Sequence, residues 1–357
     1  MGHAIRTGVI LEELQKNYEV MVFASERGYN YLSEKFPNVY EINGFNTVYE
    51  DNSVQNIKTF KKCIKDLPKD IKKNMRVMNK RAVEFEPNII ISDFEHYSNS
   101  LSYMLRVPVI SIDNMHSIRY CKIDYPHKYK IEKIKAESVI KTLFAKYKRI
   151  IITSFFYPPI KKPQKVVIYP PILREEIIKR NGNNYEDYIT VYQTSQSNNQ
   201  LIEVLKERKE KFIIYGFNKT ETDDNLTYKE FNEEEFYDDI ENTQAVIANG
   251  GFTFISEALY LGKPIFSMPT QGNFEQILNA CYVEKLNYGE MHDDITSETL
   301  SNFIDKIPEY KKSLESYERQ DNSALINDLK NSIEKFSVEF NPDKTRGIMK
   351  TIEKRLG

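Results

Sequence analysis

Residues 249–264 read NGGFTFISEALYLGKP, and they lie between the apolar runs QAVIA and IFSMP. The two runs have the length of buried strands, and the segment between them has the pattern of a helix. Two adjacent glycines at such a junction let the backbone approach a ligand closely, although a tight turn alone would also explain them. The stretch predicts one unit of an open α/β sheet, in which ligands bind at the carboxyl ends of the strands.

The start of this predicted helix has the features of a nucleotide-binding site. Gly250 and Gly251 would leave the amides of Thr253 and Phe254 free at the positive end of the helix, where a phosphate can bind. Glu257 follows one turn later, and its carboxylate can accept two hydrogen bonds from a ribose diol. A solvated helix residue is the alternative interpretation of Glu257.

The same alternation of strands and helices runs through the whole chain, and 357 residues suit two domains. Apolar runs such as NIIIS and VPVISID predict buried parallel strands, and a lysine-rich helix is expected from about Ser53 to Glu86. The three prolines of FFYPPIKKPQ predict a linker. We therefore expect an α/β protein with two doubly wound, Rossmann-like domains, residues 1–160 and 161–335, and a C-terminal helix, residues 336–357, that packs back on the first domain.

Composition excludes several classes of protein. Cys63, Cys121 and Cys281 have no CxxC spacing, so neither a disulfide framework nor a thiolate zinc site is indicated. No apolar run approaches the roughly 20 residues of a membrane-spanning helix. A cytoplasmic protein is expected.

Charge is unevenly distributed, although the whole chain balances 50 Lys and Arg against 52 Asp and Glu. Residues 1–170 carry an excess of basic residues, concentrated in Lys61–Arg81 and in an amphipathic helix predicted over 128–148. Such a surface can bind an anionic membrane, and a solvated helix face is the alternative. No recognition motif for nucleic acid is present, so no nucleic acid partner is expected.

The motifs after the double glycine resemble those of nucleotide-sugar glycosyltransferases of the GT-B fold. The resemblance rests on Gly251-Phe252, Glu257, Gly262-Lys263-Pro264, Met268-Pro269 and the run from Glu275 to Ala280, EQILNA. In the first half, GHAIR, ISDFEHYS, ISIDNMH and TSFFYPP are similar to a bacterial and archaeal branch related to the lipid-linked muramyl-peptide GlcNAc transferase.

This resemblance implies a donor site in the second half. Glu275 and Gln276 would bind the hydroxyls of the donor sugar and Glu257 the ribose. Asn249 stands where related sequences have a histidine that touches the diphosphate, so backbone amides would carry more of that contact. No metal and no cofactor are expected beyond the nucleotide-sugar co-substrate, with UDP as the expected nucleotide. The full donor-binding set is Ser195, Ser197, Asn249, Gly250, Gly251, Thr253, Phe254, Glu257, Glu275, Gln276 and Asn279.

The catalytic groups are expected in the first half. By the resemblance, His3 lies where related enzymes carry their base, and Asp93 ends a strand whose loop should face it, so Asp93 would orient the imidazole. Both residues could instead serve as helix caps, and His3 as a phosphate contact. The reserve candidates on the acceptor side are Glu95, His96, Asp113 and His116.

The sequence as a whole predicts an inverting, metal-independent glycosyltransferase that acts on a lipid or cell-envelope glycan acceptor, at the inner face of the membrane. A UDP-sugar 2-epimerase of the same fold and a non-catalytic nucleotide-sugar-binding protein are the alternatives. The sequence does not indicate the oligomeric state. GHAIR also resembles the loop that follows a first strand, so we expect a strand ahead of Met1.

Overall fold

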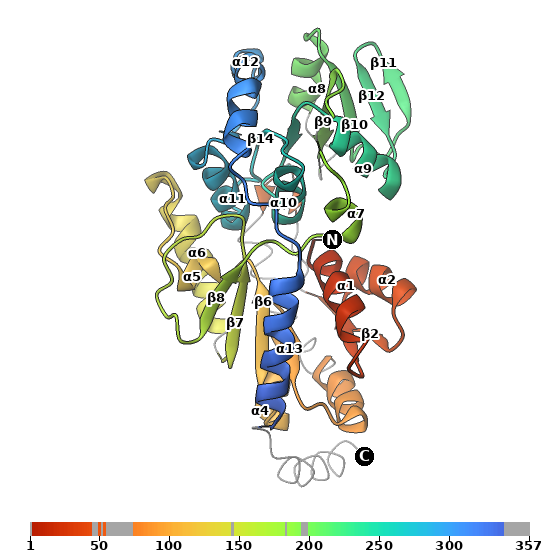
Figure 1. Ribbon diagram of the computed structural model, residues 1–357, viewed down its shortest axis with the longest axis vertical. Coiled ribbons are helices and arrows are strands. Elements are labelled where there is room, and N and C mark those ends of the chain that lie inside the picture. Colours follow the sequence, from red (N-terminus) through yellow and green to blue (C-terminus); the bar gives the residue numbers. More distant parts are fainter. Residues whose placement is uncertain are drawn as a thin grey trace.

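The computed structural model describes residues 2–44, 49–50, 53–54, 74–143, 146–182, 184–193 and 199–338. Its two larger sheets have four and seven strands. Figure 1 shows the N-terminal half, coloured red to yellow-green, and the C-terminal half from β9 to α12, coloured green to blue, at opposite ends of the long axis. The predicted mixed α/β architecture with parallel sheets is confirmed.

The N-terminal half contains a two-stranded parallel sheet, β1-β2, and a four-stranded parallel sheet in the order β5-β6-β7-β8. The central strands β6 and β7 are almost wholly buried, because their isoleucine-rich sequences pack against helices on both faces. The elements are α1 (Gly2–Leu14), β1 (Val22–Ala24), α2 (Glu26–Lys35), β2 (Val39–Glu41), β3 (Tyr49–Glu50), β4 (Ser53–Val54), a helix over 74–85, β5 (Ile90–Ser92), α4 (Tyr97–Leu105), β6 (Val109–Asp113), α5 (Ser117–Tyr120), the 3-10 helix η1 (His127–Tyr129), α6 (Lys130–Leu143), β7 (Arg149–Thr153) and β8 (Val166–Tyr169).

Two predictions for this half are wrong. The proline-rich segment 155–164 is not the linker between the sheets, because β8 follows it and pairs in parallel with β7. The chain leaves the first sheet only after Tyr169. The predicted helix from Ser53 is also wrong at its start, since β3 and β4 form a small antiparallel pair there; residues 55–73 lie outside the described part.

The C-terminal half is built on a seven-stranded sheet in the order β11-β12-β10-β9-β13-β14-β15, parallel except for β11. The predicted strands QAVIA and IFSMP form β13 and β14, whereas no strand was predicted at β11, β12 and β15. The elements are α7 (Glu175–Ile178), β9 (Tyr188–Tyr192), α8 (Asn199–Lys206), β10 (Lys211–Tyr215), β11 (Glu221–Asp223), β12 (Leu226–Lys229), α9 (Glu233–Asn242), β13 (Val246–Ala248), α10 (Phe252–Tyr260), β14 (Ile265–Ser267), α11 (Phe274–Lys285), β15 (Gly289–Met291), α12 (Ser297–Leu314) and α13 (Ser323–Val338).

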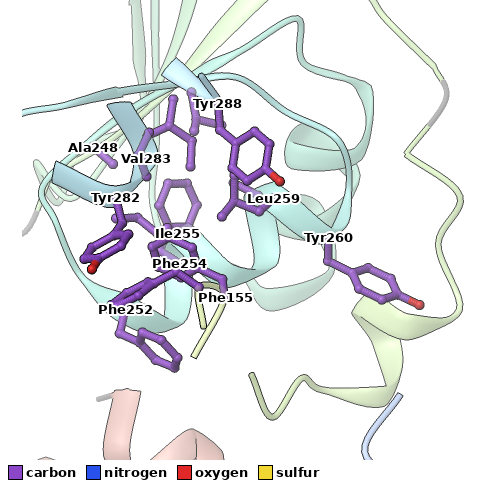
Figure 2. Close-up of a cluster of buried hydrophobic side chains, with 14 of the residues drawn as sticks. Phe155, Ala248, Phe252, Phe254, Ile255, Leu259, Tyr260, Tyr282, Val283 and Tyr288 are labelled. Atoms are coloured by element: carbon purple, nitrogen blue, oxygen red, sulfur yellow. The ribbon is translucent and has the colours of Figure 1, made fainter. Parts of the chain in front are cut away.

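The quoted stretch begins directly after β13 and forms the turn into α10 and α10 itself, which is buried on nearly all sides. Its side chains belong to a cluster that also contains Phe155 and Phe156 of the N-terminal half. Figure 2 shows Phe155 beside Phe254 and close to Phe252, with Tyr282 and Val283 of α11 in the same cluster. Phe156 stacks on Tyr282 with ring centroids 3.7 Å apart. The two halves therefore share an apolar core next to the glycine turn.

Helix α13 returns to the N-terminal half (Figure 1). Its residues Leu325, Leu329 and Ile333 pack in one cluster with Ile10 of α1 and Ile110 of β6. The prediction had placed most of α13 in the second domain, and apart from its first three residues the predicted C-terminal helix over 336–357 stays untested. Residues 339–357 lie outside the described part.

Candidate active site

The first turns of α1 and α10 meet between the two halves. A Cβ atom on Gly2 would lie only 2.5 Å from Thr253 Oγ1, so the contact requires a residue without a side chain at that position. The contact lies on a cavity of about 2190 Å³ whose lining includes His3, Asp93, Glu257, Glu275 and Gln276. Two helix N-termini, each with a positive partial charge, thus point into one cavity.

The double glycine has two separate roles. A Cβ on Gly250 would lie 2.3 Å from the backbone oxygen of Gln276, so this glycine allows the turn to pack against the start of α11. A Cβ on Gly251 would meet nothing within 4 Å. Gly251 lines the cavity, so its backbone is the part of the turn that a ligand can approach.

His3 and Asp93 form the predicted pair. The Nδ1 atom of His3 lies 2.8 Å from Asp93 Oδ1, and the His3 side chain is 50% exposed. Donation of the Nδ1 proton to Asp93 leaves Nε2 as the ring nitrogen that can accept a proton. The structure therefore brings together the two residues that the sequence proposed as base and orienting group.

Arg6 completes this pair, and the sequence reasoning missed it. Its Nε donates to Asp93 Oδ2 at 3.1 Å, its Nη2 contacts Asp93 Oδ1, and its Nη1 donates to Asn114 Oδ1 at 3.3 Å. Burial opposes ionisation of Asp93, but the charges of Arg6 and His3 outweigh it and lower the pKa of Asp93 to about 2. The carboxylate is therefore ionised at neutral pH.

The same network sets the charge of His3. Enclosure within the cavity works to lower the pKa of the imidazole, but the Asp93 carboxylate outweighs this effect and the pKa of His3 is raised above 6.5. Phe94 follows Asp93 with a φ of 50°, a conformation that costs a non-glycine residue energy. Its ring stacks near the His3 ring, with centroids 6.4 Å apart. The strained turn thus brings both the carboxylate and the aromatic ring to the imidazole.

The predicted sugar-binding residues lie opposite this pair. Glu275 Oε1 accepts a hydrogen bond of 2.7 Å from Asn114 Nδ2, which links the first turn of α11 to the end of β6 in the other half. Gln276 Oε1 accepts from the backbone N–H of Thr270 at 2.8 Å, which leaves its amide NH₂ to face the cavity that it lines. A chain of contacts runs from Glu275 through Asn114 and Arg6 to Asp93.

Glu257 is held by a residue that the sequence did not indicate. Arg174 donates from Nε to Glu257 Oε1 at 2.9 Å and from Nη2 to Oε2 at 2.8 Å, and both side chains are almost fully buried. Burial raises the pKa of Glu257, and Arg174 counters this only in part. Each carboxylate oxygen retains a second lone pair, so Glu257 can still accept a hydroxyl hydrogen bond.

Three of the predicted donor-binding residues shape the site and do not line the cavity. Asn249 donates to the backbone oxygen of Met268 at 3.2 Å, and Asn279 donates to that of Gly250 at 2.9 Å. Both asparagines are buried, and Gly250 lies against α11. They support the turn at the start of α10, so the prediction of direct contact is corrected for them. Ser195 and Ser197 lie outside the described residues.

Of the reserve acceptor-side residues, Glu95 lines the cavity, whereas His96, Asp113 and His116 do not. Asp113 and His116 are fully buried and contact each other at 2.6 Å, and Asp113 also accepts from the backbone N–H of His116 at the start of α5. Glu95 accepts from the backbone N–H of Tyr97 at the start of α4 and lies 2.8 Å from His96. The prediction that Asp113 and His116 face an acceptor is therefore wrong, because no acceptor reaches side chains with no exposed surface. Among the described residues, no group of three His, Cys, Asp or Glu side chains could hold a metal ion.

Arg6, Asn114 and Arg174 are the main residues absent from the prediction. Arg6 had a weak signal, since it follows His3 by three positions and so lies on the same side of a helix. Asn114 and Arg174 had none, because each contacts a residue that is far away in sequence.

Comparison with known proteins identifies the family. Residues 1–308 match the family described as Glycosyl transferase family 1. An uncharacterized glycosyltransferase of Methanosarcina acetivorans is 34% identical over 125 residues, which cover 35% of this chain and 29% of that relative. The chain thus matches less than a third of the length of that curated relative.

Solved structures give the fold. The Phytolacca americana UGT2, complexed with UDP-2fluoro-glucose and pterostilbene, has a TM-score of 0.65 at 11% identity, over 94% of this chain and 96% of its own. MurG of Acinetobacter baumannii has a TM-score of 0.57 at 12% identity, with the same coverage. These likenesses show the GT-B fold, with two Rossmann-like domains. By the family match over residues 1–308, the chain belongs to Glycosyl transferase family 1.

Proposed function

We propose that this protein is an inverting, metal-independent glycosyltransferase that moves a sugar from a UDP-sugar to a hydroxyl acceptor. The observation that carries the proposal is the meeting of the α1 and α10 N-termini beside the His3–Asp93 pair. Helix N-termini bind phosphate, and an imidazole oriented by a carboxylate is a general base. UDP-2fluoro-glucose in the similar plant structure supports uracil as the base of the donor nucleotide.

The proposed reaction follows from these positions. The acceptor O–H gives its proton to Nε2 of His3 while its oxygen attacks the anomeric carbon from the face opposite the diphosphate. The bond from the anomeric carbon to the diphosphate oxygen breaks, and the electron pair leaves with the diphosphate. The α1 and α10 N-termini stabilise the charge that develops there. Glu275 and Gln276 hold the sugar hydroxyls, and Glu257 holds the ribose.

A donor screen tests this function against its alternatives. The protein is incubated with UDP-sugars and thymidine-diphosphate sugars, with and without a mixture of hydroxyl acceptors, and melting shifts, free nucleoside diphosphate and product mass are measured. Release that depends on the acceptor, with a glycosylated product, is expected. An epimerised sugar without acceptor would identify an epimerase, and a melting shift without any product would identify a binding protein.

The pH dependence of turnover provides a second test. Only neutral His3 can accept the acceptor proton, so kcat/KM should fall at low pH, with a midpoint above the ordinary imidazole pKa of 6.5 because Asp93 raises it. In Asp93→Asn the midpoint should move to lower pH, since the neutral amide no longer stabilises the imidazolium, while the plateau rate falls. A midpoint that does not move in Asp93→Asn would contradict the role of Asp93.

We propose a lipid or cell-envelope glycan as acceptor and an anionic membrane as the surface on which it is met. Helix α6 exposes Ile131, Ile134 and Val139 beside the exposed Lys130 and Lys135. Exposed apolar side chains among lysines suit a membrane surface. Most of the other basic segment, Lys61–Arg81, lies outside the described residues. No described helix has the length and apolar character needed to cross a membrane.

Vesicle binding tests the membrane proposal. In sedimentation with phosphatidylglycerol vesicles at low salt, the protein should pellet with the vesicles. The double variant Lys130→Gln/Lys135→Gln should weaken this binding by roughly thirtyfold, since each cation contributes about 1 kcal/mol. The matched control Lys209→Gln/Lys211→Gln removes two exposed lysines from the other half and should bind normally. Absence of vesicle binding by the unmodified protein, together with efficient transfer to a water-soluble acceptor, would exclude this proposal.

A further inference from the structure

The side chain of Asn114 joins the two halves of the molecule beside the candidate base. Asn114 follows β6 of the N-terminal half, whereas its partner Glu275 lies in the first turn of α11, in the C-terminal half (Figure 1). Its Nδ2 donates to Glu275 Oε1 at 2.7 Å, and its Oδ1 accepts from Arg6 Nη1 at 3.3 Å. Asn114 is only 6% exposed, although it lines the cavity. Both ends of its amide are therefore in use, one by α1 and one by α11.

The chemistry of the two partners permits only one orientation of this amide. Arg6 has N–H donors and no acceptor, so it must face the oxygen of Asn114. The carboxylate of Glu275 has acceptors alone, so it must face the nitrogen. A flipped amide would lose both hydrogen bonds. Asn114 is thus a directed link between a cation and an anion that belong to different halves.

Arg6 continues this link to the base. It is 4% exposed, and its Nε and Nη2 contact the two carboxylate oxygens of Asp93 while its Nη1 holds Asn114. Nη2 also lies 2.9 Å from Nδ1 of His3. The guanidinium is a rigid planar group, so a shift at the nitrogen that holds Asn114 changes the contacts of the other two nitrogens. The position of Asn114 therefore affects both residues of the His3–Asp93 pair.

The charges around His3 give this arrangement a measurable consequence. Burial lowers the pKa of His3 and Asp93 raises it, while Arg6 lowers it and Glu275 raises it. The charged groups that face the imidazole thus come from the end of β5, from α1 and from α11. Asn114 lies between Arg6 and Glu275, whose charges act on the imidazole in opposite directions. Loss of either hydrogen bond of Asn114 therefore alters the proton affinity of the base.

We propose that Asn114 is a positioning residue that couples the sugar-binding site of the C-terminal half to the base of the N-terminal half. The proposed function assigns the donor sugar to Glu275, so the catalytic use of the coupling rests on that function, whereas the contacts do not. A sugar hydroxyl that donates to Glu275 Oε1 competes with Asn114 Nδ2 for the same oxygen.

Two effects of this competition reach His3. The hydrogen bond from the sugar disperses the charge of Glu275, and Arg6, released from Asn114, turns more fully to Asp93. Both effects weaken the attraction of the carboxylates for the protonated imidazole. A bound sugar thus favours neutral His3, which is the form that accepts the proton of the acceptor hydroxyl.

A double-mutant cycle in the ligand-free protein tests the coupling without any donor. The imidazole of His3 is titrated by NMR in the unmodified protein, in Asn114→Leu, in Glu275→Gln and in the double variant, and His3→Ala identifies its signal. Glu275→Gln should lower the pKa of His3, because a carboxylate is lost. This shift should be at least about twofold smaller when residue 114 is already leucine, which forms no hydrogen bond. An equal shift in both backgrounds would show that Glu275 acts through space alone and would overturn the proposal.

Two further variants separate coupling from a general loss of structure. Asn114→Asp keeps an acceptor for Arg6 and places a second carboxylate against Glu275, so it should raise the pKa of His3. Asn322→Leu is the matched control, because Asn322 also donates one hydrogen bond and accepts one, both with Leu173, and does not line the cavity. It should lower the melting temperature and leave the pKa of His3 unchanged. If Asn114→Leu behaved in the same way, Asn114 would have only a structural role.

Kinetics tests whether the coupling serves the reaction. With the donor and acceptor that the screen identifies, Asn114→Leu should lower kcat by about tenfold, the size of one hydrogen bond to a charged group. The affinity for UDP, measured by calorimetry, should stay unchanged. Weaker UDP binding with an unchanged kcat would overturn the positioning role. Absence of any turnover in the unmodified protein would refute the proposed function instead, and the NMR cycle would still decide whether Asn114 couples the two halves.

Discussion

His3→Ala lowers kcat by about 10²–10⁴-fold and leaves the affinity for the nucleotide donor nearly unchanged. General-base catalysis typically contributes this much, and His3 contacts Asp93 and not the predicted donor residues. Steady-state kinetics with saturating donor and acceptor, together with calorimetry of nucleotide binding, measures the two quantities separately. Loss of turnover at constant affinity is the signature of an interaction made in the transition state.

The control for this prediction is His127→Ala. His127 is exposed in the 3-10 helix ahead of α6 and does not line the cavity, so its loss should leave kcat unchanged. If His3→Ala retained near-normal turnover, the base would have to be Asp93 or Glu95. The first is a weak base, because Arg6 holds its pKa at about 2. His116 is excluded as a substitute, since its side chain has no exposed surface.

Arg6 gives the His3–Asp93 pair a property that a simple dyad lacks. Its guanidinium contacts both oxygens of Asp93 and also Asn114, which in turn donates to Glu275. The position of Asp93 is therefore coupled to a residue of the donor half. Movement of Glu275 toward a donor sugar would release Asn114, and the effect would reach the pair through Arg6.

The C-terminal fold was predictable because its signals are local. Apolar runs of strand length alternate with helical patterns from Asp187 onward, and the strand, helix and strand predicted around the double glycine form β13, α10 and β14. The strand β8 was assigned to the wrong domain because strand pairing depends on distant residues. The prolines of 155–164 indicate only that this segment forms no helix and no central strand. They do not indicate to which sheet the following strand belongs.

The sequence predicted the residues that line the candidate site, but it did not predict the residues that hold those side chains in place. Glu257, Glu275 and Gln276 follow strand ends, where ligands of such sheets bind. Asp113 and His116 also lie at a strand end, but their side chains are buried and Asp113 caps the start of α5. Whether a side chain at a strand end faces the cavity or the interior depends on side-chain packing. Arg174 could not be inferred, because its partner Glu257 is far away in sequence and the pair forms only when the start of α7 packs against α10.

The second large effect is expected at the buried ion pair. Glu257→Gln should weaken nucleotide binding by about ten- to a hundredfold, because a charge-assisted hydrogen bond contributes roughly 1.5–3 kcal/mol. It should also lower the free energy of unfolding by about 3–5 kcal/mol, since Arg174 loses its buried carboxylate partner and the remaining carboxylate, Glu233, is more exposed. Calorimetry well below the melting temperature and urea unfolding measure the two effects.

Two controls separate binding from stability at this ion pair. Glu241→Gln removes a carboxylate that pairs with Arg180 away from the cavity, so it should cost some stability and no nucleotide affinity. Gln276→Ala should lower turnover or change sugar preference with little effect on nucleotide affinity, because its amide faces the predicted sugar and not the ribose. If Glu257→Gln loses stability while its nucleotide affinity stays unchanged, the carboxylate only holds Arg174 in place, and the nucleotide is bound without it.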